Sequence, residues 1–398
     1  MKIGIYGGTF NPPHLGHMAA ARDVTEALGL DRLILIPDRT PPHKELPAGS
    51  ATAQQRLEMT KLAADRLELG KRVEVSDLEL RRTGKSYTVD TLTELKKAHP
   101  KDELWLLMGT DMFLTFHQWY QPERICQLAN LVAFGRAAGD EAQFGAQKER
   151  LERDFGAKVS FCTLPNLVEV SSTELRTALA EGRGQDRLDC SIYGYILRHG
   201  LYGTHADLHH LSLEDLRACS YSMVKAKRLP HIRGTEEEAA KLARRWGADE
   251  LDARKAAILH DCTKYWNLEQ QLKSCEKYGI LLDQVERHTL SLLHAKSGAG
   301  VARTVYGMPD RICNAILWHT TGKANMTLLE KILYIADYSE PSRSYDWCGK
   351  LRELVMEDLD AAVLYGLEIT INHTRKKEQT IHYRTIEARD YLLSHRKA

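Results

Sequence analysis

Apolar runs of strand length alternate with amphipathic segments of helical length along the first half of the chain. The strand-like runs are KIGIYG at the N-terminus and residues 32–37, 72–80, 104–109, 130–136 and 158–164. Helix-like stretches such as 51–69 and 88–98 lie between them. Strands that alternate with helices of this length are typical of βαβ units and predict a doubly wound parallel sheet. In such sheets ligands bind at the carboxyl ends of the strands.

The pattern changes after about residue 207, where apolar residues recur at helical spacing and β-branched runs are few. Segments with this spacing are 212–229, 235–246, 250–264, 286–304, 309–318 and 326–338. The periodicity predicts an all-α second domain, a helical bundle. We therefore expect two domains, 1–206 and 207–398, joined near the stretch 199–212.

Composition supports two domains and excludes several classes of protein. A chain of 398 residues is longer than one average domain. The net charge of +1 argues against a nucleic-acid or membrane-surface binder. The chain begins directly with a strand-like run and holds no apolar stretch of about 18 residues, which a membrane helix needs. The eight cysteines form no C-x-x-C pair and fit reduced thiols. We expect a soluble, cytoplasmic protein with no nucleic-acid or membrane partner.

The loop GGTFNPPHLGH, residues 7–17, is the first candidate site. Gly7 and Gly8 allow a close approach of the backbone to a ligand. A helix that starts near Leu15 would offer free N–H groups to an anion. His14 and His17 would share one face of it. The P-loop lysine is absent, and no third ligand for zinc is obvious. Read alone, these histidines leave metal binding, acid–base chemistry and anion binding open.

Three further segments place polar groups near the ends of predicted strands. Lys44 follows the second strand in PPHK. Asp111 follows the strand 104–109, with Trp119 eight residues later. The segment VSSTELR carries a helix start signal together with hydroxyl groups and Arg176, which would suit a phosphate contact.

Taken together, six segments resemble bacterial nicotinate-nucleotide adenylyltransferases. They are GGTFNPPHLGH, PPHK, SYTVDTL (86–92), MGTDMFLTFHQW, VAFGR (132–136) and VSSTELR. The motif H-x-G-H, with S-S-T-x-x-R, marks the wider superfamily of adenylyl- and cytidylyltransferases, and SYTVDTL and GTD…W narrow it to the pyridine-nucleotide branch. The resemblance covers about residues 1–205 and implies a Rossmann-like fold for them.

The resemblance implies a reaction in which the phosphate of nicotinate mononucleotide attacks the α-phosphorus of ATP and pyrophosphate leaves. The nucleophile is already an anion, so positioning and charge stabilisation suffice and no general base is required. His14, His17 and Arg176 would contact the ATP phosphates with Lys44 nearby, and Mg²⁺ would accompany the nucleotide. The remaining implied binding residues are Gly7, Gly8, Thr9, Phe10, Tyr87, Thr88, Gly109, Asp111, Trp119, Arg136, Ser171, Ser172 and Thr173. Among them, Trp119 would stack on the nicotinate ring and backbone amides near Thr88 would meet its carboxylate. A different acceptor, such as another mononucleotide or phosphopantetheine, stays open.

Histidines and aspartates that follow apolar runs form the candidate site of the second half. They are His231, His260, Asp261, His294, His319 and Asp337. Buried imidazoles and carboxylates are costly unless they are paired or metal-bound. This donor set suits Zn, Fe or Mn, and a helical bundle is a common place for such sites.

The order H…HD…D is similar to that of the HD phosphohydrolase superfamily, and HTTG and IADYSEPSR (335–343) resemble its YqeK family. That family is related to symmetrical diadenosine tetraphosphate hydrolases, which cut their substrate into two ADP. The resemblance implies one or two metal ions, iron by family or else manganese or zinc. His231, His260, Asp261 and Asp337 would hold one ion, and His294 and His319 would help to hold a second. Lys264 and Arg343 would neutralise phosphate charge.

Two residues depart from the family pattern without replacing an expected ligand. Thr235 stands where a small apolar residue is usual, and Lys296 where proline or valine is common. A metal-bearing regulatory module without turnover and a hydrolase for another nucleotide polyphosphate remain alternatives for this half. A homo-oligomer is also an open possibility.

Overall fold

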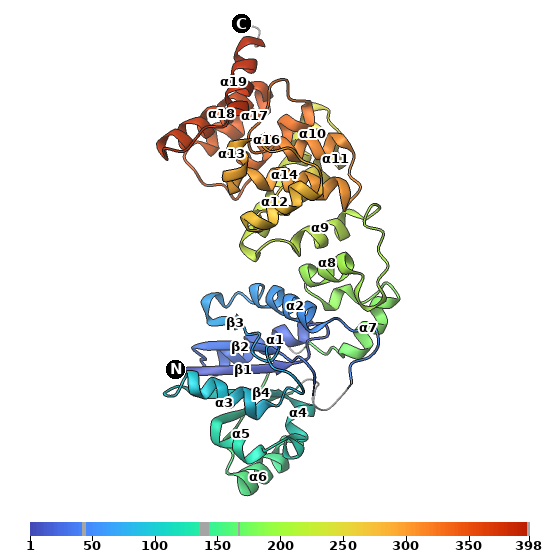
Figure 1. The fold of residues 1–398 in the computed structure, drawn as a ribbon, viewed down its shortest axis with the longest axis vertical. Helices are drawn as coiled ribbons and strands as arrows, with labels where there is room; N and C mark the ends of the chain where they lie inside the picture. The colour runs from blue at the N-terminus through green and yellow to red at the C-terminus, as the bar shows by residue number, and fades with distance from the viewer. Residues whose placement is uncertain (42–44, 136–142, 166–167, 396–398) are drawn as a thin grey trace. The chain divides into compact units, whose positions relative to one another are not determined.

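The computed structural model describes residues 1–41, 45–135, 143–165 and 168–395, and these fall into two compact units (Figure 1). The first unit comprises Met1–His205 and the second Ala206–Ala398. Within the described ranges, no helix is both long and apolar enough to cross a membrane.

The first unit is built on one parallel sheet. Among the described residues its strands are β1 (Lys2–Gly8), β2 (Arg32–Pro37), β3 (Val73–Val75), β4 (Glu103–Gly109), β5 (Ala129–Phe134) and β6 (Val159–Cys162). Their order is β3-β2-β1-β4-β5-β6, and every pairing is parallel. The prediction of a doubly wound parallel sheet is confirmed. The chain reverses its direction of winding between β1 and β4, where open sheets of this kind bind ligands.

Helices cover both faces of the sheet. The described helices of this unit are α1 (Leu15–Ala27), α2 (Ala53–Asp65), α3 (Thr88–Ala98), α4 (Thr110–Leu114), α5 (Pro122–Leu128), α6 (Phe144–Phe155), α7 (Ser172–Ala180) and α8 (Cys190–His199), with 3₁₀ turns at η1 (Gly70–Arg72), η2 (Phe116–Gln118), η4 (Gln185–Arg187) and η5 (Leu201–Gly203). Of these, α7 and α8 pack with α2 in a separate apolar cluster. The stretch 88–98 is helical from end to end, as its pattern predicts.

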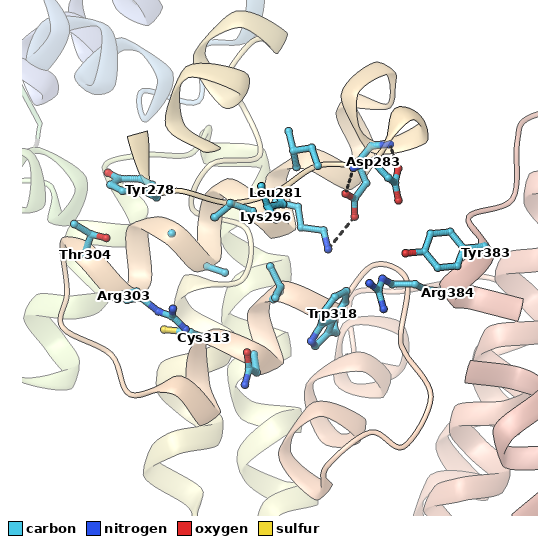
Figure 2. Close-up of a pocket in the computed structure, with 17 residues that line it drawn as sticks. Tyr278, Leu281, Asp283, Lys296, Arg303, Thr304, Cys313, Trp318, Tyr383 and Arg384 are labelled. Carbon is cyan, nitrogen blue, oxygen red and sulfur yellow. Dashed lines mark hydrogen bonds and ion pairs between the residues drawn. The ribbon is translucent and has the colours of Figure 1, made fainter. Parts of the chain in front are cut away.

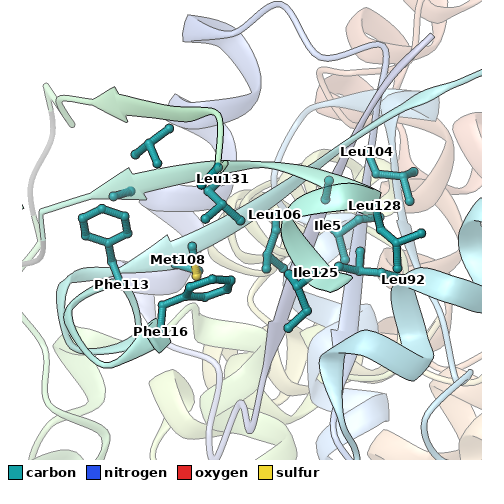
Figure 3. Packing of buried hydrophobic residues seen from close by; sticks show 14 of the residues in the cluster. Ile5, Leu92, Leu104, Leu106, Met108, Phe113, Phe116, Ile125, Leu128 and Leu131 are labelled. Atoms are coloured by element: carbon teal, nitrogen blue, oxygen red, sulfur yellow. The ribbon is translucent and has the colours of Figure 1, made fainter. Parts of the chain in front are cut away.

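Alternation along the strands divides the core between the two faces. Ile5, Leu106 and Leu131 point to one face and pack against Leu92 of α3 and Ile125 of α5 (Figure 3). The residues that follow them in their strands, such as Leu107 and Val132, belong to the cluster on the opposite face. Because both faces are covered, the strands are nearly continuous apolar runs.

The third predicted strand, 72–80, is shorter than its pattern suggests. Only Val73–Val75 is extended at the edge of the sheet, and Ser76 adds one further bond from its N–H to the Leu35 carbonyl. The Ser76 hydroxyl then accepts from the Leu78 N–H, and Leu80 N–H bonds to the Asp77 carbonyl. Serine and aspartate compete with strand pairing through such local bonds, so the chain turns here.

Every regular element in the described part of the second unit is a helix, which confirms the prediction of an all-α domain. Its helices are α9 (Leu213–Tyr221), α10 (Leu229–Trp246), α11 (Glu250–Leu259), α12 (Leu268–Lys277), α13 (Gln284–His288), α14 (Leu290–Thr304), α15 (Asp310–Trp318), α16 (Leu328–Ser339), α17 (Cys348–Glu357), α18 (Leu359–Lys376) and α19 (Tyr383–His395), with the 3₁₀ turn η6 (Ala226–Arg228) before α10.

Several helix bounds differ from the sequence pattern. The predicted helix 250–264 ends at Leu259, and the stretch 286–304 is divided at Thr289. After α11 the backbone bonds become i to i+3 turns, from Cys262 N–H to Leu259 and from Lys264 N–H to Asp261. The turn lets His260 and Asp261, which are adjacent in sequence, both face the interior.

Candidate active site and metal centre

A cavity of about 400 Å³ lies at the carboxyl ends of β1 and β4 in the first unit. We call it the sheet-edge cavity. It is lined by Gly7–Asn11 after β1, by Leu106–Gly109 at the end of β4, and by residues of α1, α3 and α7. It therefore occupies the point of the sheet at which the order of strands reverses, as the doubly wound fold predicts.

His14 and His17 together begin α1. The His17 N–H points to His14 Nδ1 at 3.4 Å and the His14 N–H to His17 Nδ1 at 3.3 Å. The two side chains thus form a reciprocal capping box. Gly16 between them leaves the necessary room, because a Cβ there would lie 2.7 Å from the Val168 carbonyl oxygen and 3.2 Å from the His14 ring.

The two histidines are not equivalent. His17 lines the sheet-edge cavity, whereas His14 is buried behind it and is absent from the lining. Their ring centroids are 3.7 Å apart, and His14 Nε2 lies 3.1 Å from the hydroxyl of Ser172. His14 therefore connects the start of α1 to the start of α7.

Arg176 of α7 reaches back to the opening loop. Its guanidinium donates to the Asn11 carbonyl at 2.9 Å and to the Thr173 hydroxyl at 3.2 Å. Both Arg176 and His17 line the cavity. A cationic group and an imidazole beside the start of a helix make this end of the cavity suitable for an anion.

Most of the binding residues expected from the sequence share this cavity. Those in its lining are Gly7, Gly8, Thr9, Phe10, His17, Thr88, Gly109, Trp119, Ser172, Thr173 and Arg176. Tyr87 and Ser171 are instead the residues that precede α3 and α7, and Asp111 is an exposed residue in the first turn of α4. Lys44 and Arg136 lie outside the described residues.

A buried arginine that the sequence analysis missed supports the opening loop. Arg56 of α2 is fully buried and donates to the Thr9 carbonyl at 2.7 Å and to Asp38 at 2.9 Å. The Thr9 hydroxyl donates to the same carboxylate at 2.8 Å. The position of Asp38 directly after β2 was a usable signal, whereas Arg56 lies within a helix and carries none.

Glu79 lines the sheet-edge cavity and was also not predicted from the sequence. Its carboxylate accepts from the Thr91 hydroxyl at 2.7 Å. Burial raises the pKa of Glu79 above its ordinary value, against the opposing effect of the hydrogen bonds from Thr91 and Ser86. On the side of the cavity near α3, Glu79 is therefore a buried acid held by hydroxyl donors, with the charges of Arg82 and Asp38 nearby.

In the second unit all six expected ligands meet in one buried cluster. They are His231 of α10, His260 and Asp261 after α11, His294 of α14, His319 after α15 and Asp337 of α16. We call this set the histidine cluster. His231 Nε2 lies 3.0 Å from Asp337 and 3.2 Å from His260 Nε2. His294 Nε2 lies 3.0 Å from Asp261 and 3.1 Å from His319 Nε2.

Hydrogen bonds set the tautomers of two of these histidines. His260 Nδ1 lies 2.6 Å from the Ala257 carbonyl and His319 Nδ1 lies 2.7 Å from the Ile316 carbonyl. A carbonyl only accepts, so each Nδ1 carries the proton and each Nε2 presents a lone pair. Burial lowers the pKa of both side chains, and that of His294, to about 4. Neutral imidazoles with lone pairs that converge on carboxylates match the donor set of a divalent cation.

The remaining cluster members differ in charge. Burial alone would lower the pKa of His231, but hydrogen bonds that its imidazole donates to Asp337 and Glu340 raise it above its ordinary value. Burial would raise the pKa of Asp261, but His260, Lys264 and His294 hold it well below its usual range. Two triads have ligand atoms close enough to share an ion, His231–His260–Asp337 and His260–Asp261–His319.

Cationic side chains border the cluster. Lys264 Nζ lies 3.1 Å from His294 Nε2, and Arg343 donates to Asp337 at 2.7 Å. Two further neighbours of the cluster were not predicted from the sequence. Arg228 pairs with Asp261, and the Glu340 carboxylate lies 3.0 Å from His231 Nδ1. The segment EPSR carried a signal for Glu340. Thr235 donates to the His231 carbonyl at 2.8 Å and so supports the first turns of α10.

Comparisons with known proteins agree with this division. Residues 5–178 match the cytidylyltransferase-like family, and residues 228–342 match the HD domain family. Proteins named "probable nicotinate-nucleotide adenylyltransferase" from Clostridium tetani and Dictyoglomus thermophilum are 34% and 36% identical to this chain. The matches cover 50% and 51% of it, and 98% and 100% of those proteins.

One solved structure matches about half of the chain. A crystal structure from Clostridium acetobutylicum, described as a predicted HD superfamily hydrolase involved in NAD metabolism, is 36% identical. The match covers 47% of this chain and 99% of that one, with a TM-score of 0.46. The chain thus belongs to the nicotinate-nucleotide adenylyltransferase family through its first unit and carries an HD domain in its second.

Proposed function

We propose that the first unit transfers AMP from ATP to nicotinate mononucleotide, giving nicotinate adenine dinucleotide and pyrophosphate. The observation that carries this proposal is the sheet-edge cavity, which gathers His17, Arg176 and the start of α1 at the switch point of the sheet. In the reaction a phosphate oxygen of the mononucleotide forms a bond to the α-phosphorus of ATP, and the bond to pyrophosphate breaks. Mg²⁺ bound with ATP would neutralise phosphate charge.

The side chains supply positioning and charge stabilisation in this step. His17 and Arg176 would donate hydrogen bonds to the phosphate oxygens on which charge develops. His14 would act indirectly, because its hydrogen bonds hold His17 and Ser172 in place. Lys44, which follows β2 in the sequence and lies outside the described residues, would add a further positive charge. An anionic acceptor needs no general base.

The start of α3 suggests how the nicotinate end is recognised. Thr88 is the first residue of α3, and no side chain caps this helix start. Uncapped N–H groups favour a carboxylate, which nicotinate has and nicotinamide lacks. Thr88 and Trp119 both line the sheet-edge cavity, so the indole would stack on the ring whose carboxylate these groups bind.

A pyrophosphate-release assay with three acceptors tests this proposal. We expect turnover with nicotinate mononucleotide to exceed turnover with nicotinamide mononucleotide by about tenfold or more, since lost hydrogen bonds leave buried donors unpaired. Phosphopantetheine should give no product. Preference for either rival acceptor would refute the assignment.

For the second unit we propose the hydrolysis of diadenosine tetraphosphate to two ADP. The proposal is supported by the histidine cluster, whose donors suit one or two divalent ions such as iron, manganese or zinc. The six residues of the cluster would hold the ions, which would polarise a phosphate oxygen and a water molecule. The water oxygen bonds to a central phosphorus while the bridge to the second ADP breaks.

Cationic side chains would neutralise the polyphosphate as it approaches. Lys264 and Arg343 border the cluster and are partly exposed, with side chains 34% and 25% accessible. Both could thus reach a ligand from the solvent side, and the contacts of Arg343 with Asp337 would also orient that carboxylate.

Metal reconstitution followed by product analysis tests this second activity. The full chain is loaded separately with Fe²⁺, Mn²⁺ or Zn²⁺ and given diadenosine tetraphosphate, guanosine polyphosphates or dNTPs. Two ADP per substrate supports the proposal. Another product pattern identifies a different polyphosphate substrate, and metal uptake without any turnover would instead support a regulatory HD module.

A further inference from the structure

A second cavity, of about 510 Å³, lies in the second unit and is lined by none of the histidine cluster (Figure 2). We call it the α14–α15 cavity. Its walls come from α14 and α15, from the segment 278–286 and from the start of α19. The volume suits a small molecule rather than a single ion.

The two acidic residues of this cavity, Glu286 and Asp283, each already have a partner within the protein. Glu286 pairs with the buried Lys296 at 2.9 Å, and Asp283 accepts from His382 Nε2 at 2.8 Å. His382 Nδ1 accepts from the Arg384 N–H at 3.2 Å, so the proton of this imidazole is on Nε2. The side chains of Asp283, Glu286 and His382 are close enough to one another to hold a metal ion. His382 nevertheless presents an N–H group, and not a lone pair, to the two carboxylates. The set is better described as internal pairing.

One cationic side chain of the cavity, that of Arg384, stands outside these pairs. The Arg384 guanidinium lies 4.8 Å from the Trp318 ring centroid and 5.2 Å from that of Tyr383. Within the described residues it forms no ion pair with a carboxylate. Lys296 Nζ lies 4.0 Å from the Trp318 centroid. In Figure 2 the ends of Lys296, Arg384 and Tyr383 face the same space beside Trp318. Arginine and lysine with a nearby hydroxyl are typical binders of phosphate.

Part of the remaining wall suits a flat, largely apolar group with a polar edge, and Arg303, which pairs with Asp310, lies beside it. Ile280, Leu317 and the ring of Tyr278 form this part, and Asn314 adds one amide. Gly300 of α14 makes the arrangement possible, since a Cβ there would lie 2.5 Å from Tyr278 Cδ2 and 3.0 Å from Ile280 Cδ1. A side-chain amide can both donate to and accept from the edge of a base.

We propose that the α14–α15 cavity binds a nucleoside monophosphate, with its phosphate at Arg384 and Lys296 and its base against Tyr278, Ile280 and Leu317. The site is distinct from the histidine cluster and independent of the reaction proposed there. Trp318 directly precedes His319 at the end of α15, so an occupant would contact the element that presents a cluster residue.

Fluorine NMR of the full chain labelled with 5-fluorotryptophan tests the proposal locally. The chain has six tryptophans, and the signals of Trp318 and Trp119 are assigned with the variants W318F and W119F. We expect AMP to shift the Trp318 signal in a saturable manner with a dissociation constant below about 1 mM. Inorganic phosphate should do so only at higher concentration. The Trp119 signal reports the sheet-edge cavity separately.

The variant Arg384→Gln supplies the decisive comparison. It should weaken the AMP-dependent shift of Trp318 by about tenfold or more, since it removes a charged hydrogen bond, whereas Arg384→Lys should retain part of it. Arg389→Gln, on the same helix but outside the cavity and paired with Asp390, is the matched control and should behave as wild type. Thermal unfolding confirms that each variant is folded. No shift with AMP in the wild type, or an unchanged shift in Arg384→Gln, would overturn the proposal, the latter because the ligand would then lie elsewhere.

Discussion

At the scale of single residues, the two histidines of the opening loop have different tasks although they share one motif. His14 is buried and bonded to the start of α7, and His17 faces the cavity. Both also cap α1. A substitution at His17 therefore combines a loss of stability with a loss of the proposed phosphate contact, and these two effects have to be separated.

The pair of variants His17→Ala and His17→Gln separates them. The alanine variant should lose about 0.5–2 kcal/mol of stability through the missing cap. The glutamine variant should recover most of this loss, because glutamine at this position completes a capping box. Both should lower adenylyl transfer by about 10²–10³-fold. Urea unfolding and pyrophosphate release measure the two quantities, and an active His17→Gln enzyme would contradict the phosphate role.

The buried histidines of the second unit predict a pH dependence of stability in the metal-free protein. The pKa values of His260, His294 and His319 fall to about 4 on burial, whereas an unfolded histidine titrates near 6.5. The unfolded chain therefore binds more protons between these values, and stability is complete above about pH 6.5 and declines as the pH falls toward 4.

The raised pKa of His231 has the opposite sign: its stabilising contribution is present below about pH 6.5 and is lost as the pH rises. Three groups outweigh one, so urea unfolding of the metal-free protein should show weakening from pH 7 to pH 5. A flat profile over this range would contradict the neutral assignment of the three imidazoles.

At the scale of elements, helix ends rather than helix interiors position the chemistry. The starts of α1, α3 and α7 surround the sheet-edge cavity, and the ends of α11 and α15 present His260 and His319. Close packing of α10 against the end of α16 adds Glu340, which is bonded to His231 Nδ1. Gly234 permits this approach, because a Cβ at that position would collide with the Glu340 carboxylate.

Gly234→Ala should therefore weaken metal binding without touching a ligand. Displacing an outer partner of a metal-binding histidine costs about 10–100-fold in affinity, and metal titration monitored by calorimetry measures it. Gly349→Ala in α17 is the matched control, since a Cβ there meets no atom within 4 Å. It should raise stability by about 0.5–1 kcal/mol and leave metal affinity unchanged. Equal affinities for both variants would exclude the proposed role of Glu340.

At the scale of the whole molecule, the chain contains two compact units with separate cores. Each candidate site lies within one unit. A ligand that binds only the folded form of a unit stabilises that unit by mass action.

Scanning calorimetry of the full chain should therefore show two unfolding transitions that respond to different ligands. Nicotinate mononucleotide at about 100 times its dissociation constant should stabilise one by about 2.7 kcal/mol. A metal chelator should lower the midpoint temperature of the other transition only. Asp337→Asn should abolish the effect of metal on the second transition and leave the first unchanged. A single transition that moves with both ligands would show that the units unfold together.

The sequence by itself determined the fold class, the change from α/β to all-α and most of the residues that meet in the two candidate sites. These features are local: periods of two or 3.6 residues define elements, and motifs such as H-x-G-H and H…HD…D place side chains at their ends. The sequence pattern failed mainly to predict where the chain turns, as it does after the short strand β3 and at the early end of α11.

Only the tertiary structure decided which of these residues face a cavity and which support them. The contacts of Arg56 with Thr9, of Glu340 with His231 and of Arg384 with Trp318 join residues 47, 109 and 66 positions apart. No short-range pattern encodes such a pairing, because it arises when helices and strands pack to bury their apolar faces. Lys296 departs from the family pattern, and its motif does not explain why. The same packing places its ammonium group against Glu286 and Trp318.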